Sequence, residues 1–249
     1  MDIRQLILPA GVGLSHLRVY TEPGPDGVCG GSPHFHTVCS EMYYVLSGEG
    51  ALELLCANGY EHIALAPGRV VFFWPGMIHR LHNPGKNLEI LIIMQNGGLA
   101  ERGDFILTFS EKIMTDDNAY AAAIRVSSHA DAIERRNLAV EGFLPLRQAM
   151  LDAPEQGREM LRRFYRHARR ILTPKAASFE WVLKSGALWD LKESQDAVDF
   201  IRDGRLEYLE KSRWSQIYPM NDSPKPGLCG DLRPYAVDEE FLAEGLRVA

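Results

Sequence analysis

Over roughly its first hundred residues, the chain alternates between short strand-like runs and turns that contain glycine or proline. The apolar, aromatic or alternating runs are Leu14–Tyr20, Glu41–Leu46, Ala51–Cys56, Tyr60–Leu65, Arg69–Trp74 and Leu88–Met94. Asn58-Gly59 is a strong hairpin signal, because a type I′ turn needs positive φ at both central residues. Short strands at this spacing, with turn signals between them, are typical of an antiparallel sandwich or barrel.

The rest of the chain has the composition and spacing of helices. From Asp116 onward it is rich in alanine, leucine, glutamate and arginine. At Asp152–Ile171, Asp152 can cap a helix, Pro154 suits its first turn, and apolar residues recur every three or four positions. We also expect helices from Thr173 to about Leu183 and from Ser194 to about Lys211, an irregular stretch over Tyr218–Tyr235, and a short helix over Phe241–Val248. The sequence thus predicts a β domain over residues 1–112 and a helical extension over residues 113–249.

Composition narrows the class of partner and the compartment. With 249 residues, 46% hydrophobic and 24% charged, the chain has the make-up of a soluble globular protein. Its net charge of -6 argues against nucleic acid or an anionic membrane as a partner, since both require a positive face. The four cysteines lack zinc-type spacing and are too few for a disulfide scaffold. Pro9 interrupts the only apolar run near the N-terminus, so a signal peptide is disfavoured and we expect a cytoplasmic location.

The segment from Gly31 to Gly50 concentrates residues that bind metals. His34 and His36 are two positions apart, so on a strand they project to the same side, with Phe35 opposite. Glu41 follows after four residues, which requires a small bulge or turn before its side chain faces the same way. Neutral imidazoles and a carboxylate suit first-row divalent metals, and His79 offers a further ligand from a later strand. These side chains predict one metal site.

Two motifs contain these residues. The first reads His34-Phe35-His36, four residues, Glu41, six residues and Gly48, and the second reads Gly68, Pro75-Gly76, two residues, His79, three residues and Asn83. Together they resemble the two motifs of the cupin superfamily: HxH, three or four residues, E, six residues, G; and G, five residues, PxG, two residues, H, three residues, N. Val28 stands where the family has a preceding glycine, and the second motif's proline comes one place late. The departure at Val28 concerns loop geometry, and the Gly, His and Asn spacing of the second motif holds. The motifs cover roughly residues 27–95.

The resemblance implies a mainly β jelly-roll barrel (the cupin fold) with a metal ion inside it, followed here by the helical extension. Carried over to this sequence, it implies the ligands His34, His36, Glu41 and His79. It also implies one divalent transition metal, which these ligand types leave open among Fe2+, Mn2+, Zn2+ and Ni2+. The extension would cover the barrel mouth, complete a substrate pocket or build a dimer interface. Cupins often dimerise through the barrel edge, so a homodimer is expected.

Other side chains are candidates for substrate contact or catalysis. Tyr43 shares strand parity with Glu41, so it either lines the cavity as a catalytic group or serves as a core aromatic. His62, on the returning hairpin strand, is either catalytic or a surface group. One face of the first strand carries three polar groups that either bind substrate at the barrel mouth or face solvent: His16, Arg18 and Tyr20. His82, three residues after His79, should point to the opposite face.

The motifs favour a metal-dependent enzyme that acts on a small polar metabolite. Two chemistries fit: a dioxygenase reaction of the non-heme iron type, or a sugar or hydroxy-acid isomerase or epimerase reaction that moves a proton with a nearby base. The alternative is a non-catalytic cupin that binds or senses a small molecule. The basic segment Arg158–Arg170 is expected to form a solvated face or ion pairs rather than a phosphate or nucleic-acid contact.

Overall fold

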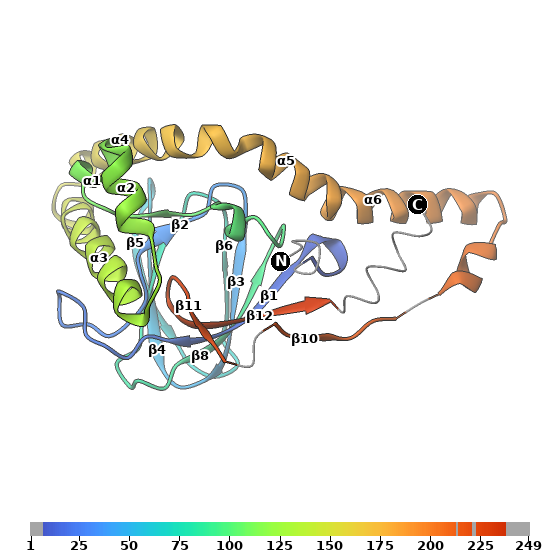
Figure 1. Cartoon of the computed structure of the whole chain (residues 1–249), viewed down its shortest axis with the longest axis horizontal. Coiled ribbons are helices and arrows are strands. Elements are labelled where there is room, and N and C mark those ends of the chain that lie inside the picture. Colours follow the sequence, from blue (N-terminus) through green and yellow to red (C-terminus); the bar gives the residue numbers. More distant parts are fainter. Residues whose placement is uncertain (1–6, 213, 221–222, 238–249) are drawn as a thin grey trace.

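The computed structural model describes residues 7–212, 214–220 and 223–237. Its strands form two antiparallel sheets that pack face to face, and its helices lie against one sheet and along one end of both (Figure 1). The mainly β start and the helical second part agree with the sequence prediction. Hydrogen bonding within the described residues does not close the strands into one continuous barrel.

The larger sheet has seven strands in the order β10-β12-β1-β8-β3-β6, with β11 paired to β12. Their bounds are β1 (Gly13–Val19), β3 (Glu41–Ser47), β6 (Val70–Phe73), β8 (Glu89–Met94), β10 (Ile217–Pro219), β11 (Lys225–Pro226) and β12 (Gly230–Val237). The smaller sheet has five strands in the order β5-β4-β7-β2-β9. Their bounds are β2 (His34–Phe35), β4 (Gly50–Cys56), β5 (Gly59–Leu65), β7 (Ile78–His82) and β9 (Ile106–Leu107).

The space between the sheets holds a dense apolar core. Strand period explains how it forms, because alternate residues of each strand point inward. On β3, for example, Glu41, Tyr43 and Val45 are buried, whereas Tyr44 and Leu46 are exposed on the outer face. The inward side chains of the other strands include Leu17, Leu52, Leu81 and Ile90. A polar group on an inward position of this interior is therefore withdrawn from water.

The helical part begins with two short helices and continues with four longer ones. They are α1 (Glu111–Thr115), α2 (Asp117–Ile124), α3 (His129–Asp152), α4 (Pro154–Leu172), α5 (Ala176–Ser185) and α6 (Ala187–Arg202). The chain also has 3-10 turns η2 (Pro9–Gly11), η3 (Ala100–Arg102), η4 (Thr173–Lys175) and η5 (Glu207–Lys211). Pro154 occupies the first turn of α4, as predicted, whereas Asp152 is the last residue of α3 rather than a cap. A capping box between Ser128 and Asp131 opens α3.

Helices α3 and α4 cover the outer face of the five-stranded sheet. The outward side chains Phe35, Leu55 and Ile78 belong to one apolar cluster with Phe143 and Leu161 of these helices. The part of the five-stranded sheet around Phe35, Leu55 and Ile78 is therefore buried on both faces, since its inner face meets the other sheet. Helices α5 and α6 continue from α4 as a long arm that extends past the sheets (Figure 1).

The expectation that Tyr218–Tyr235 is irregular was wrong. Although this stretch has four prolines and two glycines, it contains all of β11 and most of β10 and β12. Pro219 and Pro226 lie at strand ends, where the missing N–H costs little. Strand β12 pairs with β1 from Gly230 to Pro234, so the chain returns to the seven-stranded sheet after the helices. The division into units at residues 112 and 113 stays a prediction.

The short helix expected over Phe241–Val248 lies outside the described residues. Every helix in the described ranges is too short or too polar to traverse a bilayer. The four cysteines carry free thiols, two of them buried and two partly buried. The cytoplasmic location and the homodimer stay predictions.

Candidate metal centre

Four polar side chains converge in the interior between the two sheets. His34 opens β2 and lies directly opposite His79 of β7 in the antiparallel register, while Glu41 opens β3. His36 follows β2, and alternation turns His34 and His36 inward and Phe35 toward the helices. The sequence predicted this grouping, and the structure brings all four side chains together.

The cluster is compact and shielded from water. The ligand-type atoms of His34, His36, Glu41 and His79 all lie within 4.8 Å of one another. Glu41 Oε2 is 3.2 Å from His79 Nε2 and 3.6 Å from His36 Nε2, and the rings of His34 and His79 are 4.2 Å apart between centroids. None of the four residues is more than 5% exposed. Their role as metal ligands stays a prediction.

Backbone carbonyls fix the orientation of the three imidazoles. The Nδ1–H of His34 donates to Ser32 O at 2.9 Å, that of His79 donates to Met77 O at 3.1 Å, and that of His36 donates to Asp104 O. With each proton held at Nδ1, each Nε2 keeps its lone pair for the interior. Partners of this kind set the tautomer and the ring orientation of metal-binding histidines.

Asp104 organises the loop that leads into the site. Its buried carboxylate accepts hydrogen bonds from the backbone amides of Thr37, Val38 and Cys39 and from the Thr37 hydroxyl. This loop supplies the bend that brings Glu41 to the same side as His36. Sequence reasoning missed Asp104, because it lies more than sixty residues further along the chain and belongs to neither motif.

The charges and unpaired atoms of the cluster fit a divalent cation. Burial opposes ionisation of Glu41, but His79 and His36 outweigh it and hold the pKa of Glu41 below its ordinary value. Burial, followed by the neighbouring His79 and His36, holds the pKa of His34 well below its ordinary value. Glu41 Oε2 and His79 Nε2 make no hydrogen bond, although buried polar atoms normally have a partner. A cation would satisfy both atoms and balance the carboxylate.

Tyr43 lies beside the cluster, as one of its two predicted alternatives required. Its ring centroid is 6.1 Å from that of His79 and 5.3 Å from that of Phe73, and the residue is 1% exposed. Burial and then the charge of Glu41 raise the pKa of Tyr43 well above its ordinary value. The hydroxyl therefore keeps its proton at neutral pH, and it has no hydrogen-bond partner among the described residues.

The other candidate residues lie away from the cluster. His62 is exposed on β5, and its ring lies tilted beside that of His82 on the outer face of the five-stranded sheet, with centroids 5.5 Å apart. His16 and Arg18 face outward on β1, where both contact Glu89. The Tyr20 hydroxyl donates to Gly227 O at 2.8 Å. The structure brings none of these proposed catalytic or substrate-binding groups to the metal centre.

A second buried polar cluster, which sequence reasoning also missed, joins the sheet to α3. The Glu53 carboxylate accepts hydrogen bonds from Tyr60 Oη, Arg147 and His82 Nε2 at 2.7 to 2.8 Å. Burial opposes ionisation of Glu53, but His82, Arg147 and Tyr60 outweigh it and lower its pKa to about 2. His82 does point away from His79, as strand parity predicted.

Comparison with known proteins assigns the central part of the chain. Residues 21–94 match the family model described as Cupin domain, which confirms the resemblance found in the motifs. The chain therefore contains a cupin domain, and the match covers less than half of its length. No curated protein matches the chain significantly.

Solved structures similar to this chain are remote. Oxalate decarboxylase from Bacillus subtilis is 16% identical with a TM-score of 0.35, over 45% of this chain and 28% of that protein. The WlaRB TDP-quinovose 3,4-ketoisomerase from Campylobacter jejuni is 17% identical with a TM-score of 0.29, over 33% of this chain and 60% of that protein. The chain thus spans less than two thirds of these proteins, and the likeness assigns no activity to it.

Proposed function

We propose that the chain is a metal-dependent cupin enzyme that acts on a small polar metabolite. One observation carries the proposal: three imidazoles with inward Nε2 atoms and one carboxylate converge, and two of their atoms have no hydrogen-bond partner. A structural core would place apolar side chains at these positions, because unpaired buried polar atoms are destabilising. A jelly-roll arrangement of the strands is part of the same proposal.

His34, His36, Glu41 and His79 would hold the ion, which we place among Fe2+, Mn2+, Zn2+ and Ni2+. When bound, such an ion supplies Lewis acidity, which orients substrate oxygens and acidifies the groups attached to them. The backbone partners of His34, His36 and His79 orient the three imidazoles so that their Nε2 atoms point inward. The surrounding core shields the four side chains from bulk water.

Tyr43 supports proton transfer as the reaction type. Its protonated hydroxyl lies next to Glu41 in the same interior, which suits a general acid acting on a substrate atom held there. This favours the isomerase or epimerase class over the dioxygenase class. A small-molecule substrate, a homodimer, a cytoplasmic location and the lack of a nucleic-acid or membrane partner remain parts of the proposal.

The test combines oxygen dependence with solvent exchange. The protein is loaded separately with Fe2+, Mn2+, Zn2+ or Ni2+ and incubated with a panel of aldoses and 2-hydroxy acids in D2O, with and without oxygen. We expect deuterium at a substrate carbon without oxygen consumption, and a large loss of this exchange in Tyr43→Phe. Turnover that requires oxygen would contradict the isomerase or epimerase class and support a dioxygenase reaction. Binding of a substrate without turnover, unchanged in Glu41→Ala, would identify a sensor or storage cupin instead.

A further inference from the structure

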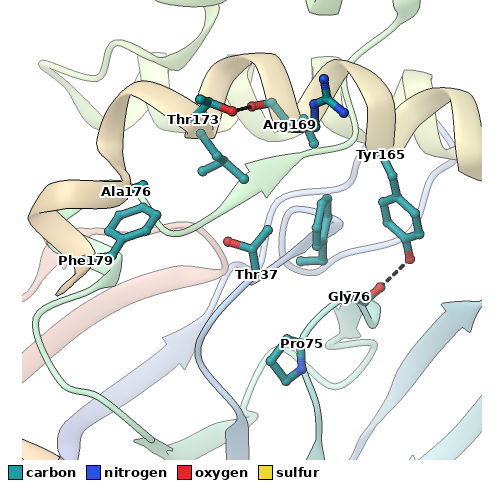
Figure 2. A pocket seen from close by; sticks show the side chains of 11 residues that line it. Thr37, Pro75, Gly76, Tyr165, Arg169, Thr173, Ala176 and Phe179 are labelled. Carbon is teal, nitrogen blue, oxygen red and sulfur yellow. Dashed lines mark hydrogen bonds between the residues drawn. The ribbon is translucent and has the colours of Figure 1, made fainter. Parts of the chain in front are cut away.

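A pocket of about 500 Å³ lies on the other side of β2 from the metal centre. Figure 2 shows α4 and the following turn crossing above Thr37, Pro75 and Gly76, with Phe179 of α5 closing one side. Its volume falls in the range of small-molecule sites. It is lined by Phe35, Thr37, Pro75, Gly76, Tyr165, Ala168, Arg169, Leu172, Thr173, Ala176 and Phe179.

The pocket walls are mainly apolar, and the hydroxyl groups among them already form hydrogen bonds within the protein. The Tyr165 hydroxyl donates to Gly76 O at 2.6 Å, so this tyrosine offers its ring to the pocket (Figure 2). The Thr37 hydroxyl donates to Asp104, and the Thr173 hydroxyl donates to Arg169 O. A ligand in the pocket would therefore meet apolar surface almost everywhere.

Within the described ranges, Arg169 is the one charged residue in the lining of this pocket. It belongs to the basic segment Arg158–Arg170, which was expected to be solvated or ion-paired. Among the described residues, the other arginines of α4 form ion pairs, as expected: Arg158 with Glu155, Arg162 and Arg166 with Glu159, Arg163 with Glu111, and Arg170 with Asp117. No such partner occurs for Arg169 within the described part of the chain, and this arginine lines the pocket. Its five N–H donors suit a carboxylate or a similar anion.

We propose that this pocket binds a small amphipathic monoanion, meaning a carboxylate attached to an aromatic ring or a short acyl chain. The apolar part would pack on Phe35, Tyr165 and Phe179, with the carboxylate at the solvent-exposed rim of the pocket. The Arg169 guanidinium, which points away from the pocket floor in Figure 2, would turn toward the carboxylate there. A sugar or a polyanion would leave most of its polar groups without partners against these walls. The site is distinct from the metal centre, because Phe35 faces the pocket while His34 and His36 face the interior.

The test is calorimetric titration of the protein with octanoate and with 1-octanol, the neutral counterpart of similar length. Both the purified protein and protein stripped with a chelator are titrated, so the result does not depend on the proposed metal function. We expect one octanoate per chain, bound about tenfold more tightly than octanol because of the charge-assisted contact with Arg169. Equal affinity for the two probes, or no saturable binding of octanoate, would overturn the proposal.

Variants separate this pocket from general surface effects. Arg169→Gln should reduce octanoate affinity to the octanol level, and Arg169→Lys should restore part of it. Arg166→Gln makes the same change of charge on the same helix outside the pocket, and should leave the affinity unchanged. Ala176→Trp fills the pocket from an exposed position and should abolish binding of both probes while the circular dichroism spectrum stays unchanged. Equal effects of the two glutamine variants, or octanoate binding that survives Ala176→Trp, would contradict the assignment.

Discussion

The sharpest structural prediction concerns Asp104, which supports the metal centre without belonging to it. Replacing it with asparagine keeps the shape of the side chain but removes its charge and one acceptor oxygen. In the native protein, the Cys39 amide donates to one carboxylate oxygen at 3.0 Å, and the Thr37 amide donates to the other at 2.9 Å. Asparagine has a single acceptor oxygen. Its amino group would therefore face the donors that bond to the second oxygen of the native carboxylate. The variant should therefore lose about two charge-assisted hydrogen bonds, on the order of 3 kcal/mol of stability.

The change should reach the metal centre through the loop between His36 and Glu41. Loss of partners of this kind typically weakens metal affinity by about 10- to 100-fold. The assay is competition of the stripped protein with a metal-responsive dye, together with urea unfolding of the same samples. Asp196→Asn, an exposed α6 carboxylate paired with Lys192, is the matched control and should change neither quantity. A metal affinity of Asp104→Asn within about twofold of the original would show that Asp104 does not support the metal centre.

Four other outcomes can be measured directly. Glu53 has a pKa of about 2 in the folded protein against 4.5 unfolded, so its stabilisation is complete above about pH 4.5 and disappears as the pH falls toward 2. Urea unfolding should show this loss, on the order of 2 kcal/mol after allowance for solvent screening, and Glu53→Gln should lack it. Arg147→Met should leave the buried Glu53 carboxylate short of a partner and lower the unfolding free energy by about 2 kcal/mol, without changing metal stoichiometry. Phe143→Ala should cost about 3 to 5 kcal/mol in the same assay, because it opens a cavity where α3 meets the sheet. His62→Ala should leave metal affinity unchanged in the dye competition, since the side chain lies on the outer face.

The sequence predicted that the four side chains of the candidate metal centre would converge, because strand period and the spacing of the two motifs both place them together. Strand period places His34 and His36 on one face regardless of how the sheets pack, and the motif spacing brings in Glu41 and His79. Support for the site comes from Asp104, whose position depends on a distant loop that returns beside β2. No periodic signal marks such a residue, so a single sequence gave no means of finding it.

Alternation along a strand shows which residues share a face, but it does not show which face is buried. Tyr43 and His62 were both candidates by parity, yet Tyr43 points into the interior and His62 points to solvent. His16 and Arg18 met the same ambiguity and lie outside. Strand β12 was missed for another reason: its residues gain their strand conformation by pairing with β1, more than two hundred positions earlier.

The central claim is that the buried cluster binds one divalent metal ion per chain. The most direct measurement is the metal content of the purified protein by inductively coupled plasma mass spectrometry, before and after reconstitution with Fe2+, Mn2+, Zn2+ and Ni2+. The structure predicts one ion per chain that resists dialysis and is lost in Glu41→Ala and in His34→Ala. A chain that retains none of these ions after reconstitution, or variants that retain as much as the original, would contradict the claim.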